Sequence, residues 1–542
     1  MVDKSLSAAR WNIALCCFGA VVSSVLLWLA YPPVGCAWVV FVALSPLLAI
    51  SRFNIPCRAA AIWALAGLLF WFANFSGFAV LRNHGVEWKF VLLGLVVGPL
   101  LRTLFFALFG FMSAYTWRRV ARNPSLRFKL CSILLVEPFL WAGCEWLRVS
   151  ASLGMEGVHL GTAVCQIPGL AWPARFGGEF LLSAIAVLAN GAIVSLVSAI
   201  AQKRLSCCTI EIALPCVLVA ILAIAARPHD DGRQLMKQMR VVLVQRNAPL
   251  KSQVEKMLSG GFDPYGHYAG LLSGIASEPA DLVVLPENAM DDFGSDIRGV
   301  EAWKAMKFVS EKAKASAVVA GGQSNTPASH GRYIQSAAAL YAFPREDGNT
   351  EPQIYIKRML LPFGECNPLA KWIPALRDAS YFVESPGTEV GLFRHNGFRV
   401  APLVCFDGFV SRPARESAAA GAQMLVLISN DLWYTPSSLP MLHFWQAVAR
   451  SVETGLPLVS AGNVGVTGVA LPDGSVRYLE NRTTGKPLMA AAGVMRETVD
   501  VSLLPIRTFY TRFGDLPLLC LAAMALGFVI FVNFKKKGTG IV

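Results

Sequence analysis

Long apolar stretches dominate the first 227 residues of the chain and return once near its C-terminus. A helix that crosses a membrane needs about 17–25 apolar residues, and most of these stretches have that length. The stretch at 36–50 is shorter, but it follows Pro32-Pro33, and we expect a second, tightly turned helix there. The pattern predicts about eight spans, at 11–31, 36–50, 59–81, 90–116, 130–147, 178–200, 209–227 and 516–534.

The polar block between the last two of these spans has a different pattern, in which short β-rich apolar runs alternate with helix-like segments. A continuous apolar run of about 4–8 residues is typical of a strand buried on both faces. The expected strands lie at 239–244, 282–285, 317–320, 400–404, 424–428 and 457–461, and the expected helices around 300–314, 411–420 and 440–454. The alternation predicts an α/β layered domain, and the block is long enough to bury one large core.

We therefore divide the chain into seven membrane helices in 1–227, an α/β domain in 228–515, and a last membrane helix with a basic tail in 516–542. Only 15% of the residues are charged, against roughly 25% in soluble proteins. The net charge of +13 could indicate nucleic-acid binding, but the basic residues cluster in short loops beside the spans, where they set topology. With eight helices these clusters share the cytoplasmic face and the α/β block is exported, so we expect no nucleic-acid partner.

The 13 cysteines form no pattern of metal ligands or disulfides. Most are scattered over the apolar N-terminal part, as expected for small apolar core residues. The polar block contains only Cys366 and Cys405. Because no C-x-x-C spacing is present, we expect no metal ion, and we expect no other cofactor.

Three residues of the polar block, each at the end of a strand-like segment, suggest acyl-transfer chemistry: Glu287, Lys357 and Cys405. A thiol becomes a good nucleophile as the thiolate, which a nearby cation and a helix N-terminus both favour. A carboxylate at the end of a buried strand can act as general base, because burial raises its pKa toward neutrality. Lys357 could also stabilise a tetrahedral oxyanion together with a backbone N–H. Glu365, eight residues further on, could hold that lysine in place.

A structural interpretation of each residue competes with this one. A lone cysteine at the end of a strand is usually a buried structural thiol, and the Pro-Glu and Ile-Lys pairs alone say little. The combination of the three, in this order within one α/β block, favours the catalytic interpretation. Cys366 is a second candidate nucleophile beside Glu365, but it lies in a loop rich in Pro and Gly, so we rank it below Cys405.

The same residues and their neighbours resemble the Glu–Lys–Cys signature of the nitrilase (carbon–nitrogen hydrolase) superfamily. The signature is carried by Leu285-Pro286-Glu287, Tyr355-Ile356-Lys357 with Pro362-Phe363-Gly364-Glu365, and Val404-Cys405-Phe406-Asp407. Further segments resemble the bacterial apolipoprotein N-acyltransferases, namely Glu145-Trp146-Leu147-Arg148 and the stretches 429–434, 443–450, 463–467 and 509–515. The resemblance covers essentially the whole chain.

This resemblance implies an eight-helix membrane bundle that carries a four-layer α-β-β-α nitrilase-like domain on the periplasmic side of the bacterial inner membrane. The implied activity is an acyltransferase that completes lipoprotein maturation, with a phospholipid as acyl donor and the N-terminal amine of a diacylated apolipoprotein as acceptor. Glu287 is the implied base, Cys405 the nucleophile that attacks the sn-1 ester, and Lys357 the oxyanion partner. The implied enzyme contacts membrane lipids, needs no cofactor and is a monomer.

The resemblance also implies supporting or substrate-binding roles for Glu365, Phe406, Asp407, Asn430 and Trp433. The family usually has tyrosine and glutamate after the nucleophile, where this chain has Phe406 and Asp407. A tryptophan of the family has no counterpart within 249–255, and an aromatic-Pro-Trp pattern is replaced by 153–157. We expect these differences to affect lipid contacts and substrate preference more than the chemistry.

Four further features have two interpretations each. Arg102, within the fourth span, either contacts a lipid headgroup or pairs with a polar neighbour. The aromatic residues of Trp372-Ile373-Pro374 and of Trp433-Tyr434 either reach the membrane interface or an acyl portal, or belong to ordinary core and loops. For His443 we expect a packing or hydrogen-bonding role on its helix rather than that of a base.

Two alternative functions remain. A membrane-tethered amidase or nitrilase would use the same triad on a small exported amide, and the matches in the membrane part argue against it. A transporter or lipid receptor with a catalytically inactive α/β block would show paired intramembrane charges and internal symmetry. We find no such repeat in the sequence, and the three candidate catalytic residues are intact.

Overall fold

The computed structural model describes residues 12–122, 125–150, 158–203, 205–227, 236–248, 263–274, 278–293, 296–328, 331–343, 351–367, 373 and 384–534. The chain divides into two compact units. One contains Met1–Arg227 together with Phe513–Val542 and is helical, and the other contains Pro228–Arg512 and is an α/β unit.

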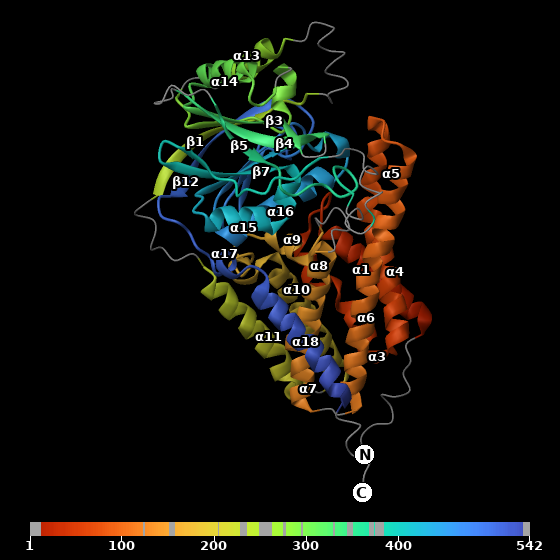
Figure 1. Ribbon diagram of the computed structural model, residues 1–542. Helices are drawn as coiled ribbons and strands as arrows, with labels where there is room; N and C mark the ends of the chain where they lie inside the picture. Colours follow the sequence, from red (N-terminus) through yellow and green to blue (C-terminus); the bar gives the residue numbers. More distant parts are fainter. Residues whose placement is uncertain are drawn as a thin grey trace. The chain divides into compact units, whose positions relative to one another are not determined.

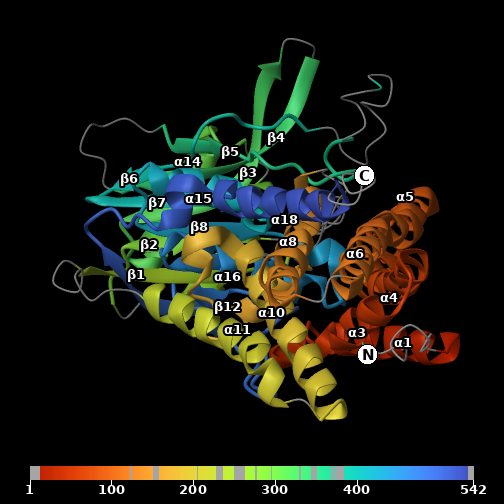
Figure 2. The ribbon, with the colours of Figure 1, turned by 90° about the horizontal axis from the view of Figure 1, so that it is seen from below.

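The helical unit consists of apolar helices that pack side by side, as Figure 2 shows for α1, α4 and α6. Its longer helices are α1 (Ile13–Leu29), α3 (Ser45–Phe53), α4 (Pro56–Phe75), α6 (Gly98–Arg122), α8 (Glu137–Ser150), α10 (Ala174–Ala201), α11 (Leu205–Ala225) and α18 (Leu516–Phe534). Shorter helices are α2 (Val40–Ala43), α5 (Trp88–Leu92), α7 (Leu126–Cys131), α9 (Leu160–Cys165) and α17 (Phe509–Phe513), the last of which runs across the boundary between the units.

Four continuous helical segments within the described residues are long and apolar enough to cross a membrane: Pro56–His84, Trp88–Arg122, Leu126–Ser150 and Ala174–Ala201. The apolar helices Ile13–Leu29, Ala37–Phe53, Ile210–Ala225 and Leu516–Phe531 are shorter. Each of the eight predicted stretches contains helix within the described residues, and four of them lie in segments with the length and composition of a membrane span. The chain is a membrane protein; the finer prediction of eight spans stays a prediction.

The α/β unit contains two six-stranded sheets with the same sequence of pairings. The first has the order β12-β1-β2-β3-β4-β5 and the second the order β11-β10-β9-β8-β7-β6. In each sheet two parallel pairings are flanked by antiparallel ones, so that β1, β2 and β3 correspond to β7, β8 and β9. The strands are β1 (Met236–Gln245), β2 (Leu282–Val284), β3 (Ala317–Ala328), β4 (Gly331–Ala342), β5 (Gln353–Ile356), β6 (Phe393–His395), β7 (Phe398–Val404), β8 (Met424–Ser429), β9 (Leu458–Gly462), β10 (Gly468–Ala470), β11 (Val476–Tyr478) and β12 (Gly493–Ser502).

Three apolar cores hold this unit together in four layers, α-β-β-α (Figure 1). One core lies between the sheets and includes Leu243 of β1 and Val404 of β7. A second packs the outer face of the first sheet on α13 (Pro264–Ser273) and α14 (Val300–Ala313). The third packs the outer face of the second sheet on α15 (Ser411–Ala419) and α16 (Leu439–Thr454). Strands buried on both faces explain the continuous apolar runs of the sequence.

Candidate active site

The three candidate catalytic residues lie just beyond the carboxyl ends of strands. Glu287 is the third residue after β2, Lys357 follows β5 directly, and Cys405 follows β7 directly. β4 is antiparallel to both β3 and β5, so β2, β3 and β5 run in one direction and end at the same edge of the first sheet. β7 brings Cys405 from the second sheet to this edge.

A glycine makes room for the backbone of Glu287. A Cβ atom placed on Gly321 of β3 would lie 2.6 Å from the Cα of Glu287 and 2.9 Å from the carbonyl oxygen of Pro286. Both contacts are closer than real Cβ atoms allow, and both involve backbone that cannot rotate away. The glycine therefore lets β3 pass closely enough to hold the end of β2 in position.

The side chains of the three residues converge, with Lys357 at the centre. The Nζ of Lys357 donates to Oε1 of Glu365 at 2.5 Å and lies 3.7 Å from Oε1 of Glu287. The thiol of Cys405 donates a hydrogen bond to the Glu287 carboxylate. Lys357 is fully buried, Glu287 is 7% exposed, and Cys405 is partly exposed. The Glu365 Oε2 atom accepts from the Leu361 N–H at 2.8 Å, which fixes its orientation toward the lysine.

The charges of this cluster are unbalanced, and the pKa values move accordingly. Burial raises the pKa of Glu287 to about 7, against the attraction of Lys357. Burial would lower the pKa of Lys357, but Glu365 and its neighbours hold it well above the ordinary lysine value. The pKa of the Cys405 thiol is raised well above its ordinary value by burial and by Glu287. The resting site therefore holds a neutral thiol beside a carboxylate that titrates near neutral pH.

A tight turn presents the thiol. Cys405 has a φ of +48°, a left-handed conformation that residues with a side chain adopt at a cost of about 1–3 kcal/mol. The short helical turn Cys405–Phe409 follows immediately. A strained turn between a strand and a helical segment exposes a nucleophile and directs the following backbone N–H groups toward the same space.

Asp407 connects this turn to the end of β5. Its Oδ2 accepts from the Tyr355 hydroxyl at 2.9 Å and from the Val404 N–H at 3.1 Å. Its Oδ1 accepts from the Met359 N–H at 2.8 Å and from the Arg358 N–H at 3.2 Å. The carboxylate thus joins the strand that carries Cys405 to the segment that carries Lys357. The aspartate predicted as a supporting residue is a buried bridge between the two.

The remaining predicted residues lie in the same region. Phe406 is 4% exposed and packs on Phe409, with ring centroids 5.1 Å apart. Asn430, after β8, accepts from the Asn463 side chain at 3.1 Å, and Trp433 belongs to the turn Asp431–Tyr434 that follows. Cys366 follows Glu365 in the loop beyond β5.

Glu384 and Asp431 lie near the site but were not predicted to belong to it, and Tyr434 was predicted only as part of an aromatic pair at the membrane interface, at an acyl portal or in the core. Glu384 lies electrostatically close to Lys357 and Glu365, and burial raises its pKa. Both its oxygens accept from Ser336, at 3.1 Å from the hydroxyl and 3.3 Å from the N–H. The pKa of the Tyr434 phenol is raised by burial and by Cys405. Asp431 pairs with His443, which confirms a hydrogen-bonding helix residue at 443. Glu384 and Tyr434 do not follow an apolar run directly. Asp431 follows β8 by two residues, but its role depends on the contact with His443, which the strand pattern does not show.

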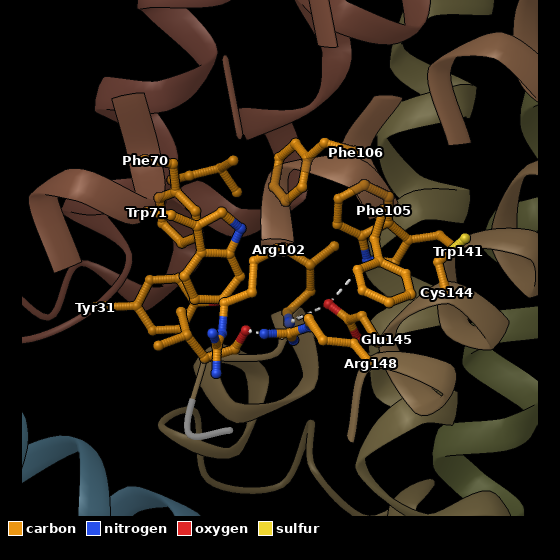
Figure 3. Close-up of a pocket in the computed structure, with 13 residues that line it drawn as sticks. Tyr31, Phe70, Trp71, Arg102, Phe105, Phe106, Trp141, Cys144, Glu145 and Arg148 are labelled. Carbon is orange, nitrogen blue, oxygen red and sulfur yellow. Dashed lines mark hydrogen bonds between the residues drawn. The ribbon is translucent and has the colours of Figure 1, made fainter. Parts of the chain in front are cut away.

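A separate cavity of about 20 Å³ in the helical unit has room for about one water molecule (Figure 3). Its lining is mostly aromatic and aliphatic, and its charged side chains are Arg102, Glu145 and Arg148. Arg102 is 1% exposed, donates to the Gly98 carbonyl at 3.0 Å and lies over the Phe75 ring at 4.7 Å. Arg148 donates to the Val158 carbonyl at 3.0 Å. Arg102 is therefore a buried structural residue rather than an exposed headgroup contact.

Some predicted features lie outside the described residues. These are the stretches 153–157 and 249–255, together with Trp372 and Pro374. Ile373, between the last two, is 51% exposed.

Comparisons with known proteins match both units. The family model of the apolipoprotein N-acyltransferase N-terminal domain matches residues 23–192, and that of carbon–nitrogen hydrolases matches residues 263–485. An apolipoprotein N-acyltransferase of Geobacter metallireducens is 28% identical over 96% of this chain and 95% of its own length. One of Gloeobacter violaceus is 29% identical over 94% of this chain and 92% of its own. The structure of an amidase from Nesterenkonia sp. is 17% identical and covers 52% of this chain and 95% of the amidase, with a TM-score of 0.33.

Proposed function

Because the chain belongs to the apolipoprotein N-acyltransferase family, we propose that it transfers an acyl chain from a phospholipid, through a thioester on Cys405, to the N-terminal amine of a diacylated lipoprotein. The observation that carries the proposal is the convergence of a thiol, a carboxylate titrating near pH 7 and a buried ammonium at the ends of three strands. These groups supply the nucleophile, the base and the cation of a two-step acyl transfer.

In the first step Glu287 takes the thiol proton while the sulfur attacks the sn-1 ester carbonyl of the phospholipid. Negative charge develops on the carbonyl oxygen, where Lys357 and backbone N–H groups after Cys405 stabilise it. The ester C–O bond then breaks, and the departing lysophospholipid oxygen takes the proton back from Glu287. A thioester remains on Cys405.

In the second step the amine of the acceptor attacks this thioester. An ammonium is not a nucleophile, so the acceptor first loses one proton to water. The free amine then attacks, and Glu287 accepts the second proton, which the attacking nitrogen releases. The C–S bond breaks, the amide forms, and Glu287 returns the proton to the sulfur. Because the donor leaves before the acceptor reacts, we expect ping-pong kinetics.

The helical unit supports a membrane location, where both lipid substrates are found. We propose that its eight apolar helices all cross the bacterial inner membrane and that residues 228–515 lie on the periplasmic side. The clusters of basic residues in the short loops support this orientation, since positive charge favours the cytoplasmic side.

The proposal is tested by mass spectrometry of the purified protein after incubation with phospholipid alone. We expect an acyl adduct on Cys405 that hydroxylamine removes and that a diacylated lipopeptide discharges. Cys405→Ala abolishes the adduct, and Cys405→Ser removes its sensitivity to hydroxylamine. Hydrolysis of small amides without any lipid adduct would instead assign the membrane-tethered amidase function. Failure of both reactions would return the protein to the binding or transport class.

A further inference from the structure

Both ring nitrogens of His443 form hydrogen bonds, one of them to the turn that carries Cys405. Nδ1 is 2.8 Å from Oδ1 of Asp431, and Nε2 is 3.0 Å from the backbone carbonyl oxygen of Cys405. The imidazole is 3% exposed. On one face it stacks on the Phe409 ring, with centroids 4.5 Å apart and planes 15° from parallel.

The two partners decide how many protons this pair holds. A carbonyl oxygen only accepts hydrogen bonds, so Nε2 carries a proton. A carboxylate also only accepts, so Nδ1 carries the second, or equivalently the pair shares it. A neutral imidazole beside an ionised Asp431 would leave one lone pair facing an oxygen in a buried place, which is unfavourable. The geometry therefore requires two protons between the imidazole and its two partners, which the imidazolium–carboxylate form supplies.

We propose that His443 and Asp431 form a positioning pair, with His443 held as imidazolium. The imidazolium donates a hydrogen bond to the Cys405 carbonyl and so maintains the left-handed turn from which the thiol reacts. The catalytic consequence of this proposal rests on the acyl transfer proposed above, whereas its structural part does not. Neither residue transfers a proton to the substrate.

The surroundings of the pair fit this role. Asp431 is 5% exposed, and its backbone N–H donates to the Val464 carbonyl at 3.2 Å, which anchors the backbone that carries the carboxylate. A Cβ placed on Gly465 would lie 2.6 Å from Oδ2 of Asp431, and the φ of +117° there also requires glycine. His443 is held by α16, whose buried face packs on the second sheet.

The turn needs such support because its conformation is strained. A φ of +48° at a cysteine costs free energy unless neighbouring contacts outweigh it. A charge-assisted hydrogen bond is about twice as strong as a neutral one, and this one acts on the carbonyl of the strained residue itself. When this hydrogen bond is lost, the turn relaxes. The thiol and the N–H groups that follow it then no longer point toward the same space.

The pair predicts a loss of function at alkaline pH. The titratable groups that face His443 are Asp431 of the turn after β8, Cys405 after β7 and Glu287 after β2. Burial lowers the pKa of His443, but Asp431 and the Cys405 carbonyl raise it above the ordinary histidine value. A group with a raised folded-state pKa stabilises the fold at low pH, and the contribution is lost as pH rises through that pKa.

Two variants separate the hydrogen bond from the charge. In His443→Gln the amide can still donate to the Cys405 carbonyl but carries no charge, whereas His443→Leu removes both. We expect the rate of acylation of Cys405 by phospholipid to fall roughly tenfold in the glutamine variant and roughly a hundredfold in the leucine variant, with the KM for phospholipid unchanged. The alkaline limb of the wild-type pH profile should be absent from both. His395→Gln, at the far end of β6, is the matched control and should match wild type.

A second pair of measurements needs no lipid. Iodoacetamide alkylation of Cys405, followed by peptide mass spectrometry across pH, reports the reactivity of the thiol, and we expect the same order of variants. In full-length protein labelled with ¹⁵N-histidine, one imidazole should stay doubly protonated at a pH where the other histidines have lost their proton, and its signal should vanish in His443→Gln. Wild-type alkylation profiles in both variants, or a singly protonated His443 at pH 7, would overturn the proposal even if the variants fold poorly. Absence of acylation in wild type would count against the acyltransferase function alone.

Discussion

Buried charges occur in both units, and the Arg52 pair of the helical unit is arranged differently from the cluster at the candidate active site. In the helical unit Arg52 pairs with Glu137 at 3.3 Å, with side-chain exposures of 7% and 1%. The Glu137 carboxylate also accepts from the indole of Trp117 at 2.8 Å and the hydroxyl of Ser113 at 3.0 Å. Arg52 donates further to the Gly191 carbonyl and lies over the Trp117 ring at 4.3 Å. One cation meets one anion, and polar neighbours satisfy most of the remaining atoms; among the described residues only the Nε of Arg52 within this pair lacks a hydrogen-bond partner.

In the candidate active site of the α/β unit, one cation, Lys357, interacts electrostatically with the three carboxylates of Glu287, Glu365 and Glu384. Three carboxylates around one ammonium cannot all be ionised at low free-energy cost in a buried place, so some of them hold protons near neutral pH. A balanced pair fixes structure, whereas an excess of one sign creates groups that exchange protons. Burial of charge alone therefore does not identify a catalytic site; the imbalance does.

Replacing the base should cause the largest loss of acylation rate. Glu287→Gln removes the proton acceptor while keeping the shape, and we expect acylation of Cys405 to fall about 10²–10⁴-fold. In wild type the acylation rate should rise with pH and reach half its maximum near pH 7, the pKa of Glu287. Rapid-quench mass spectrometry across pH measures both. An unchanged acid limb in Glu287→Gln would show that another group is the base.

The same titration should act on stability in the opposite direction. The pKa of Glu287 is raised from 4.5 to about 7, so the folded state holds its proton more tightly than the unfolded chain. Folding is therefore favoured below pH 4.5, and the advantage, about 3 kcal/mol, is lost as pH rises toward 7. Thermal unfolding across this pH range should show less pH dependence in Glu287→Gln than in wild type.

Removing the single cation should have the next largest effect. Lys357→Met keeps the length of the side chain but leaves the carboxylates without a partner, and we expect acylation to fall about 10²–10³-fold. Breaking a buried pair in this way also costs about 3–5 kcal/mol of stability. Lys304→Met, which removes a lysine from an exposed pair with Glu301, is the control. Acylation within a few fold of wild type in Lys357→Met would exclude the lysine from the oxyanion site.

Reducing the excess of carboxylates should sharpen the contrast without destroying the site. Glu384→Gln keeps an acceptor for Ser336 and removes one negative charge, so the pKa of Glu287 should fall. We expect the midpoint of the acid limb to move to lower pH, with a change of less than about tenfold in the maximal rate. A pH profile that coincides with the wild-type profile would place Glu384 outside the cluster that sets the base.

The smallest effect on chemistry should come from the balanced pair. Arg52→Met in the helical unit leaves Glu137 buried without its cation, and we expect a loss of about 3–5 kcal/mol in stability. Acylation per folded molecule should stay within about twofold of wild type, because the pair touches no reacting group. Thermal unfolding and titration of active Cys405 separate the two quantities. A large loss of activity in fully folded Arg52→Met protein would contradict the structural role.

The strands that the sequence predicted are those buried on both faces. β1, β2, β3, β7, β8 and β9 contain the continuous apolar runs, and they form the parallel centres of both sheets. β12 was not predicted because only one face of its second half is covered, so exposed Thr498 and Asp500 alternate with buried Val499 and Val501. β4 was not predicted because its run of alanines is equally typical of a helix.

The site residues that could be predicted are those at the ends of strands. Glu287, Lys357 and Cys405 follow predicted or adjacent apolar runs, so their convergence could be expected. Glu384 and Asp431 come from loops whose position depends on hydrogen bonds to Ser336 and Val464, and no local pattern encodes those contacts.

The pairing of β1 with β12 has a consequence for how the α/β unit can be rearranged. The two strands run antiparallel in register from Met236–Ser502 to Gln245–Gly493, so the chain enters and leaves the unit at neighbouring residues about 5 Å apart. Such a unit can be inserted between two helices by a single genetic event, since its ends require no separation in the host. It should equally tolerate circular permutation, with a short glycine linker joining its two ends and new termini opened in an exposed turn.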